Sequence, residues 1–125
     1  MSGSPAAVVV YITCTSFAQA EALARHLIDE RLAACANIIP GMRSLYRWQG
    51  VIESAEETVL ILKTAAACVP ALTARVKQLH TFTVPCVVAV PVVDGSAEYL
   101  AWIAAETVGE GPEVRRSGSP EVRTP

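Results

Sequence analysis

Residues 31–50 read RLAACANIIPGMRSLYRWQG and carry the clearest structural signal in the chain. An apolar run is interrupted at Pro40 and Gly41, and a strict alternation follows, in which Tyr46 and Trp48 share one face. Alternation with a period of two predicts a β-strand. Because proline cannot donate a hydrogen bond within a sheet, Pro40 marks a break, a bulge or an edge. We therefore expect one long strand with an irregularity near its middle.

A second long strand follows directly and returns along the first. Gly50 supplies the turn, and residues 51–63 form the returning strand. Long hairpins reach beyond their own core, and their open edges need a partner. The hairpin therefore indicates assembly as well as a fold.

Two apolar runs and three helical stretches complete the predicted elements. Residues 8–14 are apolar almost throughout, which is typical of a strand covered on both faces. Residues 86–93 form another such run, in which Pro91 favours a sheet edge. Helix caps are expected at Ser16, or alternatively Thr15, and at Ser96, and a proline suits the first turn of the middle helix. The apolar stripe of the first helix consists of Phe17, Ala20, Leu23, Ala24, Leu27 and Ile28.

The predicted order is β-α-β-β-α-β followed by a short helix. This is the split β-α-β, or ferredoxin-like, order of the α+β class. Right-handed crossovers place the first and last strands side by side and antiparallel. The end of the first strand at Cys14, the end of the second helix at His80 and the hairpin tip at residues 48–50 therefore lie towards one edge of the sheet.

Length and composition bound the class of protein. The chain has 125 residues, of which 52% are hydrophobic, and a formal net charge of −2. This length suits one domain with a real core, and the charge argues against nucleic acid or an anionic membrane as the main partner. No apolar run approaches the roughly 20 residues that span a bilayer, and we recognise no signal peptide. We expect a cytoplasmic protein with a folded domain at 8–106, a flexible N-terminus at 1–7 and a flexible tail at 107–125.

The sequence contains no motif of enzymatic chemistry that we recognise. It lacks a Gly-rich phosphate loop, paired metal carboxylates and a Gly-x-Ser-x-Gly elbow. None of the four cysteines forms a Cys-x-x-Cys pair, which argues against zinc-knuckle and thioredoxin-type sites. A nucleophile pair of Cys14 and His80 would lack an orienting carboxylate. We therefore expect that the protein is not an enzyme.

Five blocks of the chain follow one another in a specific order. They are RLAACANIIPG (31–41), SLYRWQG (44–50), the I-E…E…L-K-T pattern (52–64), L-H…V-P (79–85) and DGSAEYLAWI (94–103). Together these blocks resemble the divalent-cation tolerance (CutA) family. The resemblance runs from residue 8 to about residue 104 and implies a homotrimer of ferredoxin-like subunits, similar in shape to PII signalling proteins. It also implies a link to copper and other divalent metals.

Cys14 and His80 match a cysteine and a histidine that are associated with copper binding in this family. Thiolate and imidazole are ligands that copper selects, and the predicted topology places both residues at one edge. The alternative is a buried thiol and a hydrogen-bonded or exposed imidazole. The chain departs from the family pattern at Leu79, Phe82 and Cys86, where some relatives carry a second histidine, a tyrosine and a glutamate. Two ligands make a weak site unless another subunit or Cys86 contributes.

Six further residues are candidates for a pocket or a subunit interface. An aromatic pair on an alternating hairpin most often packs against a neighbour, here another subunit, and a pocket is the alternative. Glu57 and Lys63 share a strand face but lie about 20 Å apart, at about 3.3 Å per residue, so they cannot pair within one chain. The other four candidates are Tyr46, Trp48, Phe82 and Cys86.

The residues and the resemblance together predict a trimer that binds copper or another divalent cation and acts in tolerance of, or response to, metal ions. One alternative is a PII-like regulatory trimer that binds a small anion or metabolite in the cleft between subunits. A second alternative is a structural trimer that scaffolds another protein.

Overall fold

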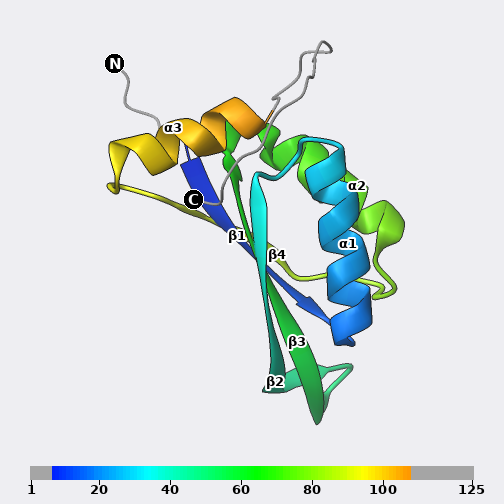
Figure 1. The fold of residues 1–125 in the computed structure, drawn as a ribbon. Coiled ribbons are helices and arrows are strands. Elements are labelled where there is room, and N and C mark those ends of the chain that lie inside the picture. Colours follow the sequence, from blue (N-terminus) through cyan, green and yellow to red (C-terminus); the bar gives the residue numbers. More distant parts are fainter. Residues whose placement is uncertain (1–6, 108–125) are drawn as a thin grey trace.

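The computed structural model describes residues 7–107 and contains a four-stranded antiparallel sheet with three α-helices (Figure 1). The strand order is β2-β3-β1-β4, and β1 pairs antiparallel with both β3 and β4. The predicted ferredoxin-like order is therefore confirmed. The elements are β1 (Ala7–Cys14), α1 (Phe17–Asp29), β2 (Cys35–Trp48), β3 (Val51–Ala65), the 3-10 turn η1 (Ala66–Cys68), α2 (Val69–Leu79), β4 (Val87–Pro91) and α3 (Ala97–Glu106).

Helices α1 and α2 lie side by side on one face of the sheet, whereas α3 lies near the start of β1 (Figure 1). Val10, Ile12 and Leu60 on the helix-covered face are completely buried. On the opposite face, Val88 and Val90 of β4 are 51% and 50% exposed. On β1 itself, Val9, Tyr11 and Thr13 are only partly buried on this face. The predicted covering of both faces of the first strand is therefore incomplete in the single chain, because both right-handed crossovers bring α1 and α2 to the same face. We call the other side the open face.

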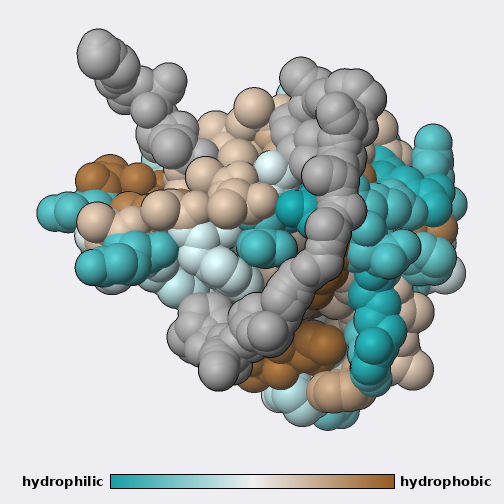
Figure 2. Space-filling view, turned by 45° about the horizontal axis from the view of Figure 1, so that its top comes forward, coloured by the Kyte–Doolittle hydropathy of each residue, from teal (hydrophilic) through white to brown (hydrophobic). Residues whose placement is uncertain are grey.

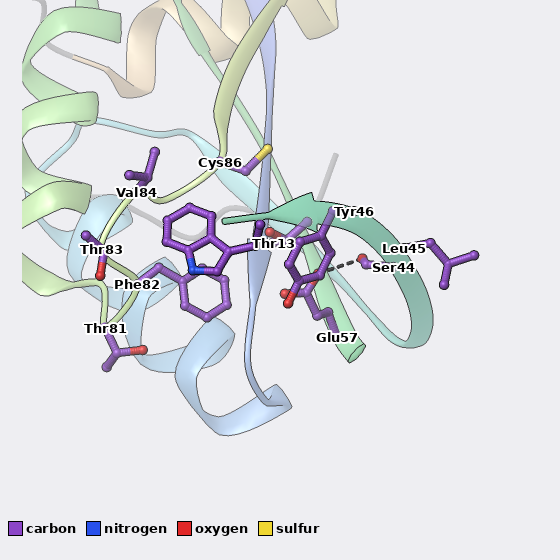
Figure 3. Close-up of a pocket in the computed structure, with 11 residues that line it drawn as sticks. Thr13, Ser44, Leu45, Tyr46, Glu57, Thr81, Phe82, Thr83, Val84 and Cys86 are labelled. Carbon is purple, nitrogen blue, oxygen red and sulfur yellow. Dashed lines mark hydrogen bonds between the residues drawn. The ribbon is translucent and has the colours of Figure 1, made fainter. Parts of the chain in front are cut away.

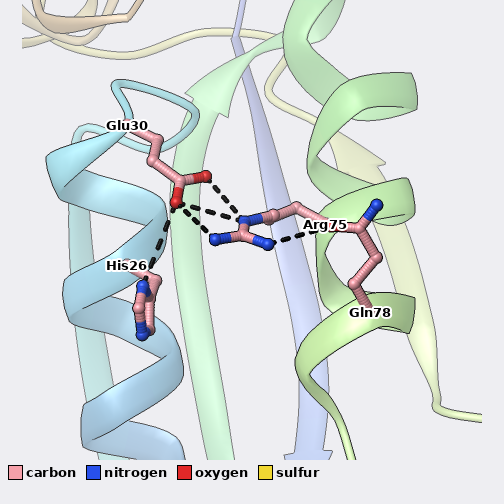
Figure 4. A network of polar contacts seen from close by, with 4 residues as sticks. All are labelled: His26, Glu30, Arg75 and Gln78. Atoms are coloured by element: carbon pink, nitrogen blue, oxygen red, sulfur yellow. Dashed lines mark hydrogen bonds and ion pairs between the residues drawn. The ribbon is translucent and has the colours of Figure 1, made fainter.

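The surface over the helix layer is hydrophilic. Hydrophilic side chains gather on the side of α1 and α2, to the right in Figure 2, whereas hydrophobic and hydrophilic side chains are mixed on the side of α3, to the left. Across the helix layer, Arg75 of α2 donates to both carboxylate oxygens of Glu30, with its Nε and Nη2 atoms each 2.9 Å from an oxygen (Figure 4). Gln78 accepts from the Nη1 atom of the same guanidinium at 2.9 Å. This polar network joins the two helices at their solvent side.

Helix α1 begins and packs largely as its sequence predicts. Ser16 caps it, because its hydroxyl accepts from the backbone N–H of Gln19 at 3.0 Å. Phe17 and Ile28, which were expected in the buried stripe, are instead 48% and 39% exposed. Both lie near the ends of the helix, where fewer neighbouring elements cover a side chain. Its buried residues are Ala20, Leu23, Ala24 and Leu27.

The hairpin of β2 and β3 contains the predicted irregularity. Ile39 pairs with Val59 and Met42 with Glu57, so two residues of β2 oppose one residue of β3. This β-bulge carries one extra residue and changes the parity of the strand. Odd-numbered residues of β2 face the open side before the bulge, and even-numbered residues do so after it. The predicted interruption at residues 40–41 is confirmed.

The hairpin ends in a two-residue turn. Gln49 and Gly50 have φ angles of 52° and 84°, and Trp48 pairs with Val51 across them. Positive φ at both central positions is typical of a type I′ turn, whose twist suits an antiparallel pair. The turn predicted at Gly50 is confirmed, and the hairpin projects beyond the helices (Figure 1).

The sequence predicted a folded domain at 8–106, with residue 7 in a flexible N-terminus and residue 107 in a flexible tail, and both residues are instead ordered parts of the domain. Ala7 already belongs to β1 and is buried. Thr107 is 9% exposed and donates from its hydroxyl to the carbonyl of Ile103 at 2.9 Å, which ties it to the last turn of α3. The remainder of both predicted flexible ends, 1–6 and 108–125, lies outside the described residues. Among residues 7–107, none of the helices is long and apolar enough to cross a membrane.

Candidate functional site

A pocket of about 540 Å³ lies on the open face, where β1 ends and the hairpin begins to project (Figure 3). The hairpin forms one wall and the loop after α2 forms another. The pocket brings together five of the six candidates for a pocket or an interface. These are Tyr46 and Trp48 of β2, Glu57 of β3, and Phe82 and Cys86 of the loop.

The bulge explains why the hairpin residues reach this pocket. Met42, the first paired residue after the bulge, accepts a hydrogen bond at its sulfur from the hydroxyl of Tyr11 at 3.3 Å. Because Tyr11 lies on the open face, the even-numbered residues that follow also face that side. Ser44, Tyr46 and Trp48 therefore line the pocket with Glu57. Without the extra residue, they would face the other side of the hairpin.

Glu57 is the only ionised side chain among the described residues that line the pocket. The hydroxyl of Ser44 donates to its Oε1 atom at 2.6 Å, and none of the ion pairs found in residues 7–107 includes this carboxylate. Burial, and then the negative charge of Glu57, raise the pKa of the Cys86 thiol. The pocket therefore has a negative potential that favours cations over anions.

The buried side chain of His80 links the end of β1 to the loop after α2 through two hydrogen bonds. Its Nε2 atom is 2.8 Å from the carbonyl oxygen of Thr13, and its Nδ1 atom is 3.0 Å from the backbone nitrogen of Phe82. The backbone N–H of Phe82 donates to Nδ1, so the other ring nitrogen carries the proton that the carbonyl accepts. The ring of Phe82 lies 4.6 Å from the imidazole, centroid to centroid. His80 therefore positions Phe82 in the wall of the pocket.

Cys14 lies at the end of β1, on the helix-covered face, and is completely buried. Burial, and to a lesser degree the charge of Glu57, raise the pKa of its thiol from 9.0 to about 11. A metal ion binds the thiolate and not the thiol. Since both nitrogens of His80 are also engaged, the pair does not fit a resident metal ion as it stands. Among the described residues, no group of three or more His, Cys, Asp and Glu side chains could hold one.

The topological part of the prediction is confirmed, because the ends of β1 and α2 and the hairpin tip do meet at one edge. The assignment of Cys14 and His80 as copper ligands stays a prediction. Sequence reasoning missed Ser44 as the partner of Glu57, although it alternates with Tyr46 on the same face. It also missed that His80 holds the loop in place. This role depends on a hydrogen bond to a backbone carbonyl, which residue types alone do not reveal.

Lys63 stands apart from the pocket, at the other end of β3. Its ammonium donates to the Oδ1 atom of Asn37 at 2.9 Å and lies 5.8 Å from the ring centroid of Tyr99. The hydroxyl of Tyr99 is 3.4 Å from the sulfur of Cys35, and this hydrogen bond is the first cause that raises the tyrosine pKa to about 12. These side chains fasten α3 to the sheet.

Comparison with known proteins gives a consistent result. The family described as CutA1 divalent ion tolerance protein matches residues 8–106. The divalent-cation tolerance protein CutA of Thermus thermophilus is 48% identical over 99 residues, which are 79% of this chain and 96% of that protein. The chloroplastic CutA of Arabidopsis thaliana is 40% identical over 80% of this chain, but the match covers only 55% of the plant protein. This chain therefore spans about half the length of the plant relative.

Solved structures agree with the sequence comparison. The divalent cation tolerance protein (Cut A1) of Thermus thermophilus has a TM-score of 0.80 at 46% identity, over 82% of this chain and 99% of that one. CutA1 of Oryza sativa has a TM-score of 0.82 at 38% identity, over 87% of this chain and 100% of that one. The family is named for ion tolerance and not for an enzymatic reaction. By its sequence and its fold, this chain belongs to the CutA1 divalent ion tolerance protein family.

Proposed function

We propose that this protein acts in divalent-cation tolerance by weak binding of copper or another divalent metal ion, as a homotrimer. Membership of the family supports the general role. The observation that supports the metal part is that soft and charged groups lie near one edge of the sheet. Glu57 and Cys86 line the pocket on the open face, and the imidazole of His80 contacts the carbonyl of Thr13 beside them. The thiol of Cys14, the next residue, faces the helix-covered side.

Weak binding is the natural consequence of this arrangement. A copper ion would have to displace the proton of a thiol whose pKa is raised, and also one of the two hydrogen bonds of His80. Thiolate and imidazole still favour copper over harder cations. Cys86 faces the pocket and is partly exposed, so it is the thiol that an entering ion would meet first.

The open face supports the proposed trimer. Ile39, Val88 and Val90 on this face are each about half exposed, and large exposed apolar patches on soluble proteins are typical of interaction sites. Strands β2 and β4 are also the edges of the sheet, and long free edges favour pairing with further chains. A cytoplasmic location and the absence of catalysis remain predictions from the sequence.

Copper titration of the full chain tests the metal part. We expect the Cys14→Ala, His80→Ala double variant to bind copper at least about tenfold more weakly, or about 1.4 kcal/mol. Cys35→Ala is the matched control, because this thiol lies at the α3 end, against Tyr99. Copper binding equal to that of the parent in the double variant would rule out this edge as the site.

The pocket favours a second candidate function, namely a PII-like module that binds a small metabolite. Its volume of about 540 Å³ falls within the roughly 300–1,000 Å³ of small-molecule sites. Its lining contains one carboxylate and, among the described residues, no basic side chain, so a metabolite that is not an anion fits better than the predicted small anion. A thermal-shift screen of metabolites in a metal chelator tests this candidate, which fails if no compound raises the melting temperature.

A further inference from the structure

We infer that the pocket binds an organic monocation with an apolar body, such as a protonated amine or a quaternary ammonium compound. This inference rests on the second candidate function above and specifies its ligand. It can be separated from the copper proposal, because it depends on the aromatic walls and not on Cys14, although both proposals use the carboxylate of Glu57.

The first argument is the charge of the pocket. Glu57 points into it from β3, with one oxygen held by Ser44 and with no ion-pair partner among the described residues. A partly buried carboxylate without a counterion attracts a cation, because the cation offsets the cost of removing the carboxylate from water. Ser44 fixes the orientation of the carboxylate and leaves its second oxygen available for a ligand.

The second argument is the set of aromatic rings around this carboxylate. Tyr46 and Trp48 are 41% and 44% exposed in the single chain, where a ligand can reach their rings, and Phe82 forms part of the opposite wall. Figure 3 shows Tyr46 beside Glu57 on the hairpin side and Phe82 on the side of the loop. A cation over an aromatic face is attracted by the negative face of the ring, and more strongly when the cation loses its water. Aromatic walls around one negative charge suit an organic cation better than a small hydrated metal ion.

The third argument is that part of the wall is preorganised. Phe82 is held by its backbone hydrogen bond to His80 and by the contact between the two rings, and His80 is itself held by the carbonyl of Thr13. A wall that is already in place does not lose further conformational entropy when a ligand binds. The polar groups that remain in the lining are chiefly hydroxyls, from Thr13, Thr81 and Thr83. They can accept hydrogen bonds from the N–H groups of a protonated amine, whereas a quaternary ammonium has no N–H to donate.

Isothermal titration of the full chain in a metal chelator tests the inference with three probes that differ in charge. Benzyltrimethylammonium is the cation, benzyl alcohol the neutral analogue and benzoate the anion. We expect the cation to bind at least about tenfold more tightly than either analogue, because only the cation interacts with both the carboxylate and the rings. Equal affinity for the three probes, or no binding of the cation, would overturn the inference.

Matched variants locate the site. Glu57→Gln keeps the shape of the side chain and should weaken binding of the cation about tenfold, whereas Glu56→Gln, on the other face of the same strand, should leave it unchanged. Trp48→Phe should retain most of the affinity, and Trp48→Leu should lose it, with both variants checked for folding by circular dichroism. Equal effects of the two glutamate variants, or full affinity in Trp48→Leu, would contradict the assignment.

One further comparison separates this inference from the two functions proposed above. Cys14→Ala should weaken copper binding and leave binding of the organic cation intact. If a neutral metabolite binds the pocket while benzyltrimethylammonium does not, the second candidate function survives and the cation inference fails. If the aromatic rings instead pack against another copy, Trp48→Leu will dissociate the oligomer and none of the three probes will bind, which also refutes the inference.

Discussion

On one face of the sheet, α1 and α2 bury the apolar side chains in the body of β1 and β3, whereas on the other face the same sheet leaves apolar side chains half exposed. Ile12 and Leu62 are inaccessible on the first face, and Ile39 and Val88 are about 50% exposed on the second. The chain therefore obtains its stability from the helix-covered face. The open face carries the pocket and the surface that we propose for assembly, so stability and binding are divided between the two sides of a single sheet.

The largest loss of stability is expected from a substitution on the helix-covered face. Leu62→Ala should lower the free energy of unfolding by about 3 kcal/mol, since it leaves a cavity in a fully packed core. Val88→Ala on the open face is the comparison and should cost less in the single chain, because half of that side chain is exposed there. Urea denaturation followed by circular dichroism measures both. Equal losses for the two variants would show that the faces do not differ as described.

We expect a rise in pH to have an intermediate effect on the stability of the folded chain. Cys14 keeps its proton more tightly in the folded chain than in the unfolded one, because burial chiefly, and Glu57 in addition, raise its pKa from 9.0 to about 11. Its contribution to stability is fully present below pH 9 and is lost as the pH rises towards 11. Thermal melts across this range should fall more steeply for the parent than for Cys14→Ala. Parallel slopes for the two proteins would contradict the pKa shift.

The smallest effect on the folding of a single chain is expected from Val88→Lys, because the new side chain can extend into solvent from the open face. The same substitution should nevertheless prevent formation of the trimer. The parent should sediment at about three times 13.3 kDa, and the variant at a lower mass, because a charge would be buried in the proposed interface. A parent that sediments as a monomer at micromolar concentration would remove the trimer from the proposal.

The sequence predicted the pocket only as a set of candidates. Alternation placed Tyr46 and Trp48 on one face, and the resemblance drew attention to Phe82 and Cys86. The structure brings these four together with Glu57, and it leaves Lys63 at the other end of β3. Such distances cannot be derived from spacing along the chain, because they depend on how the loop after α2 folds back over the open face.

Local chemistry was enough to determine the elements themselves. The period of two, the cap at Ser16, the interruption at Pro40 and the turn at Gly50 all act within a few residues, so they can be recognised in the sequence and are present in the structure. The order of these elements, together with right-handed crossovers, determined the topology of the sheet.

Only the tertiary structure decided which face stays open and which polar groups meet. The hydrogen bond from Ser44 to Glu57 joins two strands, and the hydrogen bond between His80 and the carbonyl of Thr13 joins residues 67 positions apart in the sequence. The exposure of Phe17 likewise depends on which elements cover the first turn of α1, and not on the periodicity of the helix. Contacts of this kind follow from packing between distant segments, and side-chain periodicity along one segment carries no information about what lies opposite it.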